Sequence, residues 1–281
     1  MKILTYFLLP ALLASSDFSL LKAQDYTFQV VECGTDTIFP AAMNTRGTVV
    51  GGLGAAGSNN SLGFVYSNRL CRIVQPTVGG LSLTGIADNG DVVGIYGTTS
   101  TNLFILDGGV ARSLPLYPHV DASWYCCLDK TTGVLAGNYE VVGSVAQYGF
   151  FYKNGKFTRL PSPGNSALTI SAINGKGTLV GTVDGASLYG FIYIDGKVQT
   201  FQYPGAKYTT FNGINNKGLI VGTYVSTGKF GVCSYDTETK TWKDLQFGVY
   251  ASAVPIGVTD SGVIAARVGV DAGLVIATPT N

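Results

Sequence analysis

A short segment recurs along almost the whole chain, and it limits the folds that the chain can adopt. The clearest copy runs from Phe211 to Tyr224 and reads FNGINNKGLIVGTY. Six copies align on one glycine, and these glycines lie about 41 to 44 residues apart: Gly47, Gly90, Gly133, Gly177, Gly218 and Gly262. Repeats of this length are typical of propellers, in which each unit supplies one four-stranded blade.

The same strand signals return in the same order within each unit. An apolar segment leads into an Asn-x-x-Gly turn, where the Asn or Asp side chain caps the backbone and the glycine takes a positive φ. A β-branched run such as Leu219 to Tyr224 follows, and then a Gly-Phe-x-Tyr strand such as Gly190 to Tyr193. A hairpin such as Asn154-Gly155 leads to a fourth strand of alternating polar and apolar residues. The sequence therefore predicts an all-β chain.

The two ends of the repeat array complement each other. The sixth unit has three strand signals, the last near Leu274 to Thr278, and no fourth strand before Asn281. Tyr26 to Val31 alternates like Thr241 to Phe247, the outer strand of the fifth unit. Pairing this amino-terminal strand with the last unit would remove an exposed sheet edge. We therefore predict a six-bladed β-propeller that the amino-terminal strand closes by completing the last blade.

Residues 1–24 differ in character from the repeats. One lysine precedes an apolar run from Ile3 to Ala14, and small and polar residues follow. This is the layout of a secretory signal peptide, and the run is too short to span a bilayer of ~30 Å as a helix. Cleavage after Ser16 or after Ala23 fits the pattern. We predict a signal peptide over 1–24 and one propeller domain over 25–281.

A family resemblance rests on the pattern of the best copies. The order Ile-Asn-Asn-Lys-Gly-x-Ile-Val-Gly-Thr-Tyr, then Gly-Phe-x-Tyr, then Gly-Lys and a Phe/Tyr-Pro-Gly, resembles the extracellular repeats of the HAF type in secreted bacterial proteins. The resemblance covers 25–281 and is strongest in the fourth and fifth units. It implies export across the bacterial inner membrane and β-repeats, and it implies no particular activity.

Composition narrows the classes of partner. The net charge is +1, and charged residues make up 12% of the chain, about half the usual quarter. No cluster of lysine and arginine is present, so a nucleic acid or an anionic membrane has no electrostatic basis. We expect a monomer without a membrane-spanning segment in the mature chain, and a partner that is a protein or a carbohydrate.

The cysteines permit a disulfide but do not reveal its pairing. Their number is odd, so at least one is unpaired: Cys33, Cys71, Cys126, Cys127 and Cys233. No CxxC pair is present, so a zinc site has no support. Cys126 and Cys127 are adjacent on a predicted strand and should point to opposite faces. We favour small buried side chains with one bridge at most.

No catalytic residue stands out. His119 is the one histidine, and any histidine-based acid–base or serine-nucleophile site would have to use it. Its counterpart in the fourth unit is Gly205, so we predict a surface turn. The carboxylates lie mostly at turns, and nothing in their spacing shows the facing pair that glycoside hydrolysis needs: Asp88, Asp107, Asp129, Asp195 and Asp260.

The turns themselves suggest one sharper hypothesis. If the six units are equivalent, one face carries a ring of oxygen-bearing side chains: Asn44, Asp88, Asp129, Asn174, Asn215 and Asp260. Such a ring could hold a hard cation such as calcium, which prefers oxygen ligands, or a small polar ligand. We favour the plainer interpretation that each residue only shapes its own turn.

Aromatic side chains also recur and could stack on sugars. The tyrosines expected at equivalent places are Tyr66, Tyr152, Tyr193 and Tyr224, and packing within or between blades explains them as well. Trp124 falls in an irregular stretch and Trp242 in an outer strand, and neither repeats.

Two functions from different classes follow. The first is a secreted, non-catalytic binding or scaffolding propeller, whose variable loops such as Gly54 to Leu62 and Val183 to Leu188 carry specificity. The second is a secreted hydrolase or lyase that uses aspartates in a central pocket, with a calcium ion. A purely structural surface protein cannot be told from the first by sequence.

Overall fold

The structure is a computed structural model that describes most of the repeat region. The described residues are 25–34, 37–54, 62–75, 80–97, 102–108, 110–120, 122–129, 132–143, 146–269 and 273–280. The predicted signal peptide over 1–24 lies outside them, as do residues 55–61 of the first variable loop.

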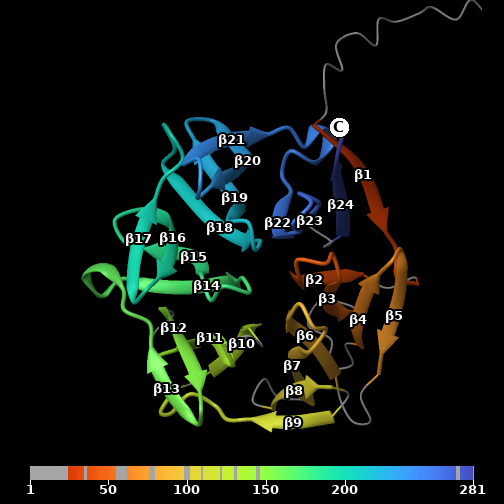
Figure 1. Ribbon diagram of the computed structural model, residues 1–281, viewed down its shortest axis with the longest axis vertical. Coiled ribbons are helices and arrows are strands. Elements are labelled where there is room, and N and C mark those ends of the chain that lie inside the picture. The colour runs from red at the N-terminus through yellow and green to blue at the C-terminus, as the bar shows by residue number, and fades with distance from the viewer. Residues whose placement is uncertain are drawn as a thin grey trace, which may run out of the picture.

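The prediction of an all-β, six-bladed propeller is confirmed. Six four-stranded antiparallel sheets stand around a central axis (Figure 1). In each sheet the first strand lies nearest the axis and the fourth lies outside. Within the described residues, the only helical pieces are two 3-10 turns, η2 (Pro163–Asn165) and η3 (Gly248–Tyr250). No described helix has the length and apolar character needed to cross a membrane.

The first three blades follow one another along the chain. Blade 1 comprises β2 (Ile38–Met43), β3 (Val49–Leu53), β4 (Leu62–Ser67) and β5 (Leu70–Val74). Blade 2 comprises β6 (Gly80–Ile86), β7 (Val92–Gly97), β8 (Leu103–Asp107) and β9 (Val110–Leu114). Blade 3 comprises β10 (Ala122–Asp129), β11 (Val134–Glu140), β12 (Gln147–Lys153) and β13 (Lys156–Arg159).

The next two blades repeat this order, and the last blade combines both ends of the chain. Blade 4 comprises β14 (Ala167–Ile173), β15 (Leu179–Asp184), β16 (Leu188–Ile194) and β17 (Lys197–Phe201). Blade 5 comprises β18 (Tyr208–Ile214), β19 (Leu219–Ser226), β20 (Lys229–Asp236) and β21 (Thr241–Leu245). Blade 6 comprises β22 (Val254–Val258), β23 (Ile264–Val268), β24 (Gly273–Pro279) and the amino-terminal β1 (Tyr26–Val31).

The strand β1 pairs antiparallel with β24 along its whole length, from Tyr26 opposite Pro279 to Val31 opposite Leu274. It therefore occupies the outer position of the sixth sheet, next to the carboxyl-terminal strand. Cys33, just beyond β1, forms a disulfide with Cys71 on β5, with the two Cα atoms 5.5 Å apart. Whether β1 is what holds the ring closed stays a prediction.

Every first strand carries a β-bulge at the same place. The pairing with the second strand slips by one residue at Ala41, Thr84, Cys126, Ser171, Asn212 and Ile256. A bulge breaks the alternation of side chains and bends the strand. A glycine of the second strand lies opposite the bulge in five blades, where a Cβ atom would overlap a main-chain oxygen of the first strand: Gly51, Gly94, Gly137, Gly181 and Gly222.

The apolar core lies between the blades, with one cluster of buried side chains at each of the six junctions. The Gly-Phe pattern of the third strand explains this packing. Phe64, Phe150 and Phe191 are fully buried. The glycine before each phenylalanine lies against apolar side chains of the next blade's first strand, so that a side chain there would clash; Gly190, for example, contacts Phe211.

The two faces of the ring have different connections. The turns between first and second strands and the hairpins between third and fourth strands lie on one face, because neighbouring strands are antiparallel. We call this the turn face. The connections between second and third strands, and those between blades, lie on the opposite loop face.

Candidate functional site

Three buried asparagines on the turn face fix turns and also join blades. Asn44, Asn174 and Asn215 are only 5%, 4% and 1% exposed. The Oδ1 atom of Asn215 accepts hydrogen bonds from the backbone N–H groups of Lys217 (3.0 Å) and Leu219 (2.9 Å). Its Nδ2 atom donates to the main-chain oxygen of Thr259 in blade 6, at 2.9 Å. Asn44 and Asn174 likewise make two contacts within their own turns and one to the next blade.

The predicted ring of six equivalent oxygen-bearing side chains is wrong at two of its positions. Asn44, Asp129, Asn174 and Asn215 do occupy one position of the repeat, but Ala87 and Thr259 complete it. Asp88 and Asp260 lie one residue further along. The sequence comparison matched side-chain chemistry between units and overlooked this offset. Each of the three asparagines does shape its own turn, but the interpretation that it does nothing else is wrong, because its Nδ2 atom also bonds the next blade.

The two displaced aspartates meet at the mouth of the axis. Asn216 Nδ2 donates to Asp88 Oδ2 at 3.0 Å and lies 3.5 Å from Asp260 Oδ2. The remaining oxygens accept backbone N–H groups, Asp88 Oδ1 from Thr45 at 2.9 Å and Asp260 Oδ1 from Asn216 at 2.8 Å. The Oδ1 atom of Asn216 accepts the N–H of Gly175 at 2.7 Å. Asn216 thus links turns of blades 2, 4 and 6 to its own.

A cavity of about 230 Å³ lies along the axis. All six blades contribute to its wall, which includes the apolar ends of the first strands at Met43, Ile86, Leu128, Ile173 and Ile214. Its volume is below the 300–1,000 Å³ that is usual for small-molecule sites. Among the described residues, no three His, Cys, Asp or Glu side chains gather where they could hold a metal ion.

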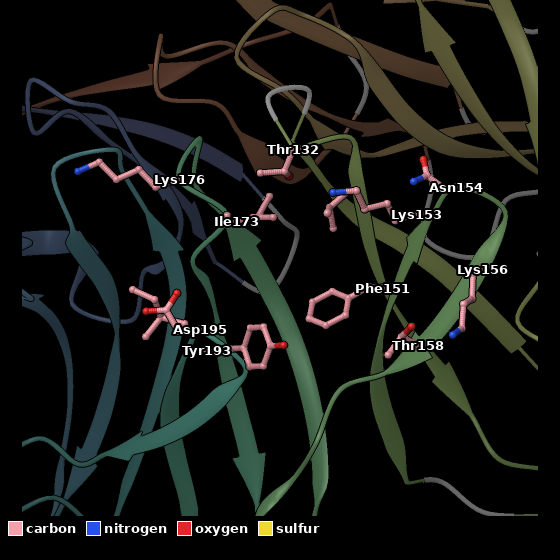
Figure 2. Close-up of a pocket in the computed structure, with 13 residues that line it drawn as sticks. Thr132, Phe151, Lys153, Asn154, Lys156, Thr158, Ile173, Lys176, Tyr193 and Asp195 are labelled. Atoms are coloured by element: carbon pink, nitrogen blue, oxygen red, sulfur yellow. The ribbon is translucent and has the colours of Figure 1, made fainter.

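A larger groove lies between blades 3 and 4, with a volume of about 650 Å³. Its floor is apolar, since the rings of Phe151 and Tyr193 lie 5.1 Å apart between centroids and Ile173 lines the floor beside them. Figure 2 shows the two rings side by side, with the polar rim around them: Thr132, Lys153, Asn154, Lys156 and Thr158 from blade 3, and Lys176 and Asp195 from blade 4.

The rim of this groove carries an excess of positive charge. Lys153, Lys156 and Lys176 are exposed, and Asp195 is the one acidic side chain that lines the groove. None of the three ammonium groups forms an ion pair or a side-chain hydrogen bond within the described part of the chain. Their charge is therefore available to a ligand, above a floor that offers two aromatic rings.

The recurrent tyrosines divide between two places in the repeat. Tyr66, Tyr152 and Tyr193 lie at one position of the third strands. Tyr224 was wrongly grouped with them, because it lies on the second strand β19; its blade supplies Tyr235 instead. Tyr224 stacks on Tyr203 of the preceding connection, with centroids 4.0 Å apart. Burial raises the pKa of Tyr66, Tyr193, Tyr224 and Tyr235, as expected for tyrosines that pack within and between blades.

The other single candidates take structural places. His119 is exposed and has a φ of 57° in the connection between β9 and β10, so the predicted surface turn is confirmed. Trp124 does not lie in an irregular stretch, because it is part of the inner strand β10, where it is half-buried. Trp242 lies in the outer strand β21 as predicted and packs on Tyr235.

The cysteines form one disulfide, Cys33–Cys71, and three are free: Cys126, Cys127 and Cys233. The prediction that Cys126 and Cys127 point to opposite faces is wrong. Their sulfur atoms lie 2.8 Å apart, because Cys126 is the bulged residue of β10 and the alternation fails there.

Sequence reasoning missed the groove between blades 3 and 4 as a site. It singled out Tyr193 and Asp195 for other reasons and passed over the lysines. A signal existed, since Lys153 and Lys156 flank a turn-face hairpin of one repeat and Lys176 lies in a turn-face turn of the next. Only the ring geometry brings these loops together around one hollow.

Comparisons with known proteins support the fold and no particular activity. No protein-family model matches the chain, and no curated protein matches it. TolB from Acinetobacter baumannii has a TM-score of 0.59 at 10% identity, covering 83% of this chain and 64% of its own. Virginiamycin B lyase from Staphylococcus aureus has a TM-score of 0.53 at 11% identity, covering 91% of this chain and 100% of its own. A structure described as YCF48 bound to D1 peptide has a TM-score of 0.54 at 9% identity, covering 93% and 97%.

Proposed function

We propose that the chain is an exported, non-catalytic binding propeller and that the groove between blades 3 and 4 is its ligand site. The observation that carries the proposal is the set of three lysine ammonium groups, unpaired within the described residues, at the rim above the Phe151–Tyr193 floor. The apolar run at the amino terminus and the Cys33–Cys71 disulfide support export, since disulfides persist in oxidising compartments.

The chemistry of the groove favours a carbohydrate that carries carboxylates, such as a polyuronate. The faces of aromatic rings pack well against the apolar faces of sugars. Hydroxyl and amide side chains form hydrogen bonds with sugar hydroxyls, and the rim supplies three of them: Thr132, Asn154 and Thr158. Lysines supply charge-assisted hydrogen bonds to carboxylates. An acidic protein segment would use the lysines but would leave these rim hydroxyls with little to recognise.

Binding of polygalacturonate to the full mature chain, followed by calorimetry and thermal unfolding, tests the proposal. A ligand at a hundred times its Kd should add about 2.7 kcal/mol to the free energy of unfolding. Lys176→Glu should weaken binding more than tenfold, because a lost charge-assisted bond costs about 1.5–3 kcal/mol and 1.4 kcal/mol is tenfold.

Lys217→Glu is the matched control, since Lys217 holds the same turn position in blade 5, outside the groove. It should bind polygalacturonate like the wild type. Binding of neutral dextran and of polyglutamate is measured in the same way. Equal binding of wild type and Lys176→Glu would contradict the groove as the site, and tighter binding of polyglutamate would make the partner a protein.

A hydrolase or lyase at the axis is the second candidate, favoured by the approach of Asp88 and Asp260 to one amide nitrogen. Against this function, one oxygen of each carboxylate already accepts a backbone N–H. Asn216 also lies between the two carboxylates at the mouth of the axial cavity. Release of reducing or unsaturated ends from polygalacturonate, abolished in Asp88→Asn and dependent on calcium, would establish this function instead.

A further inference from the structure

The bulge of β10 places two thiols in direct contact. In a regular strand, Cys126 and Cys127 would project to opposite faces. Here the pairing with β11 slips between Tyr125 and Cys127, and the Sγ atoms of Cys126 and Cys127 lie 2.8 Å apart. This separation is shorter than the usual approach of two unbonded sulfur atoms, so the local backbone already brings the two sulfurs toward bonding distance.

The other blades show what these two positions ordinarily hold. The bulged residue is Thr84 in blade 2 and Ser171 in blade 4. The hydroxyl of Thr84 donates to the main-chain oxygen of Tyr125 in the next blade, at 2.6 Å. The residue after the bulge is small, as at Ala172. Only blade 3 has cysteines at both places, and neither thiol is needed to form the bulge.

The contact between blades 3 and 4 does not depend on the Cys126 thiol. Its Sγ atom lies 3.5 Å from the main-chain oxygen of Ile170 in blade 4. This contact is equivalent to the one between the hydroxyl of Thr84 and the main-chain oxygen of Tyr125. Asn138 already satisfies the Ile170 oxygen by donating from Nδ2 at 2.9 Å, and its Oδ1 accepts the N–H of Ile170 at 2.8 Å. The thiol proton can therefore be removed without leaving a buried carbonyl unpaired.

We propose that Cys126 and Cys127 are a redox modification site that forms a disulfide between adjacent residues in the exported protein. The oxidant is the disulfide form of an exported thiol oxidoreductase. The Cys126 thiolate attacks that disulfide and releases one thiol, giving a mixed disulfide. Cys127 loses its proton and displaces the second thiol. Two protein thiols are oxidised to one disulfide, and one oxidant disulfide is reduced to two thiols.

The order of attack follows from burial. Cys126 is partly exposed, whereas Cys127 is buried in the core cluster between blades 3 and 4. Burial raises the pKa of the Cys127 thiol well above its usual range, so it is the poorer thiolate at neutral pH. Cys233 is also buried and is not bonded to another cysteine, so it should remain a free thiol.

The bond should be easier to reduce than the Cys33–Cys71 bridge. Adjacent Cα atoms lie ~3.8 Å apart, whereas ordinary disulfides join Cα atoms about 4.4–6.8 Å apart. Constrained disulfides have more oxidising potentials and are the labile ones. Graded reduction should therefore open Cys126–Cys127 at a lower dithiol concentration than Cys33–Cys71.

Thiol alkylation of the full chain, exported by a bacterial host and denatured without reductant, tests the proposal. Arg112 and Lys130 bound a tryptic peptide, 113–130, that contains both cysteines. We expect this peptide without alkyl groups and lighter by two hydrogens than the dithiol, and we expect Cys233 to be alkylated. A peptide with both cysteines alkylated, or one joined to Cys33, Cys71 or Cys233, would overturn the proposal.

Two variants keep the test independent of folding. Cys126→Ser and Cys127→Ala each introduce the residue that blade 4 has at the same place, Ser171 or Ala172, so both should fold. Each variant should leave its remaining cysteine open to alkylation, while Cys33–Cys71 stays oxidised. A folded Cys126→Ser in which Cys127 resists alkylation after denaturation would show that Cys127 has another partner, contrary to the proposal.

Discussion

Asn174 in blade 4 donates from Nδ2 to the main-chain oxygen of Asn215 in blade 5, at 3.1 Å. Asn215 repeats the contact to Thr259 in blade 6, and Asn44 makes it to Ala87 in blade 2. In these three blades, the residue that starts the turn therefore also fastens its blade to the next. Because the donor belongs to the repeat, each blade that has this asparagine gains a hydrogen bond to the next sheet. No residue specific to one blade is needed for it.

Asn215→Ala should lower the free energy of unfolding by about 1–3.5 kcal/mol. The variant loses a turn cap, worth about 0.5–2 kcal/mol by analogy with helix caps, and the hydrogen bond to the oxygen of Thr259, worth about 0.5–1.5 kcal/mol. That oxygen still accepts the N–H of Gly262, at 3.0 Å. Ala87 holds the equivalent position in blade 2, so the turn itself should still form. Urea unfolding measures the change. Gln199→Ala on the exposed outer strand β17 should stay within about 0.5 kcal/mol of the wild type.

Gly181→Ala should be costly although its backbone conformation is ordinary. A Cβ atom there would overlap the main-chain oxygen of Thr169 and contact the ring of Phe191. Overpacking of this kind costs about 1–3 kcal/mol, and a main-chain neighbour cannot move aside as a side chain can. Blade 6 has Ala266 at this position, and Ala266→Gly should cost only about 1 kcal/mol there. Equal costs for the two variants would contradict this explanation of the glycine.

The sequence sufficed for the blades because each has its own turn and strand signals at a constant spacing. It also identified the strand Tyr26–Val31 by its alternation. The bulges left no such signal, since a bulge is a slip in pairing and not a residue type. The bulge of β10 caused the error over Cys126 and Cys127. The offset of Asp88 and Asp260 was overlooked because the repeats were aligned by side-chain chemistry alone.

The site was less predictable for a different reason. The groove between blades 3 and 4 depends on the hairpin Lys153–Lys156 of one repeat lying beside the turn at Lys176 of the next. Each segment alone is an ordinary polar turn. Only the angle between neighbouring sheets decides whether two such turns enclose a hollow, and that angle follows from packing along the whole junction.

Replacing Cys33 and Cys71 together by serine should lower the free energy of unfolding by about 3–4 kcal/mol. The bridge closes a chain segment with a sequence separation of 38, and loop closure of that length restricts the unfolded chain by about this amount. Urea unfolding of the double variant gives the value. Wild type in strong reductant should fall to the same midpoint, whereas a reduced wild type that keeps its original midpoint would show that the bridge adds nothing.

Deleting residues 25–31 tests whether β1 closes the ring. The deletion would leave β24 as an exposed edge with unpaired backbone groups, and such edges recruit other chains. We expect the truncated protein to self-associate and to unfold at a lower temperature, measured by light scattering and calorimetry. A truncated protein that stays monomeric and keeps the wild-type Tm would show that the ring holds without β1.

Alkaline pH should unfold the protein through its buried tyrosines. Burial is the main cause that raises the pKa of Tyr26 to about 12, and the charge of Asp25 adds to it. Burial likewise raises the pKa of Tyr139 to about 12. The neutral hydroxyl is favoured in the folded state, so its contribution to stability is complete below pH 10, the unfolded value, and is lost as pH rises toward 12. The urea midpoint should therefore fall across this range.

Tyr26→Phe removes one of these ionisations and should move the alkaline loss of stability to higher pH. The measurement is the urea midpoint at several pH values, followed by circular dichroism together with the absorbance of tyrosinate. Tyr96→Phe, at a ring that is 39% exposed on β7, is the matched control and should behave as the wild type does. If Tyr26→Phe and Tyr96→Phe show the same alkaline transition as the wild type, ionisation of the buried Tyr26 hydroxyl does not limit stability, and the cause must lie elsewhere among the buried tyrosines.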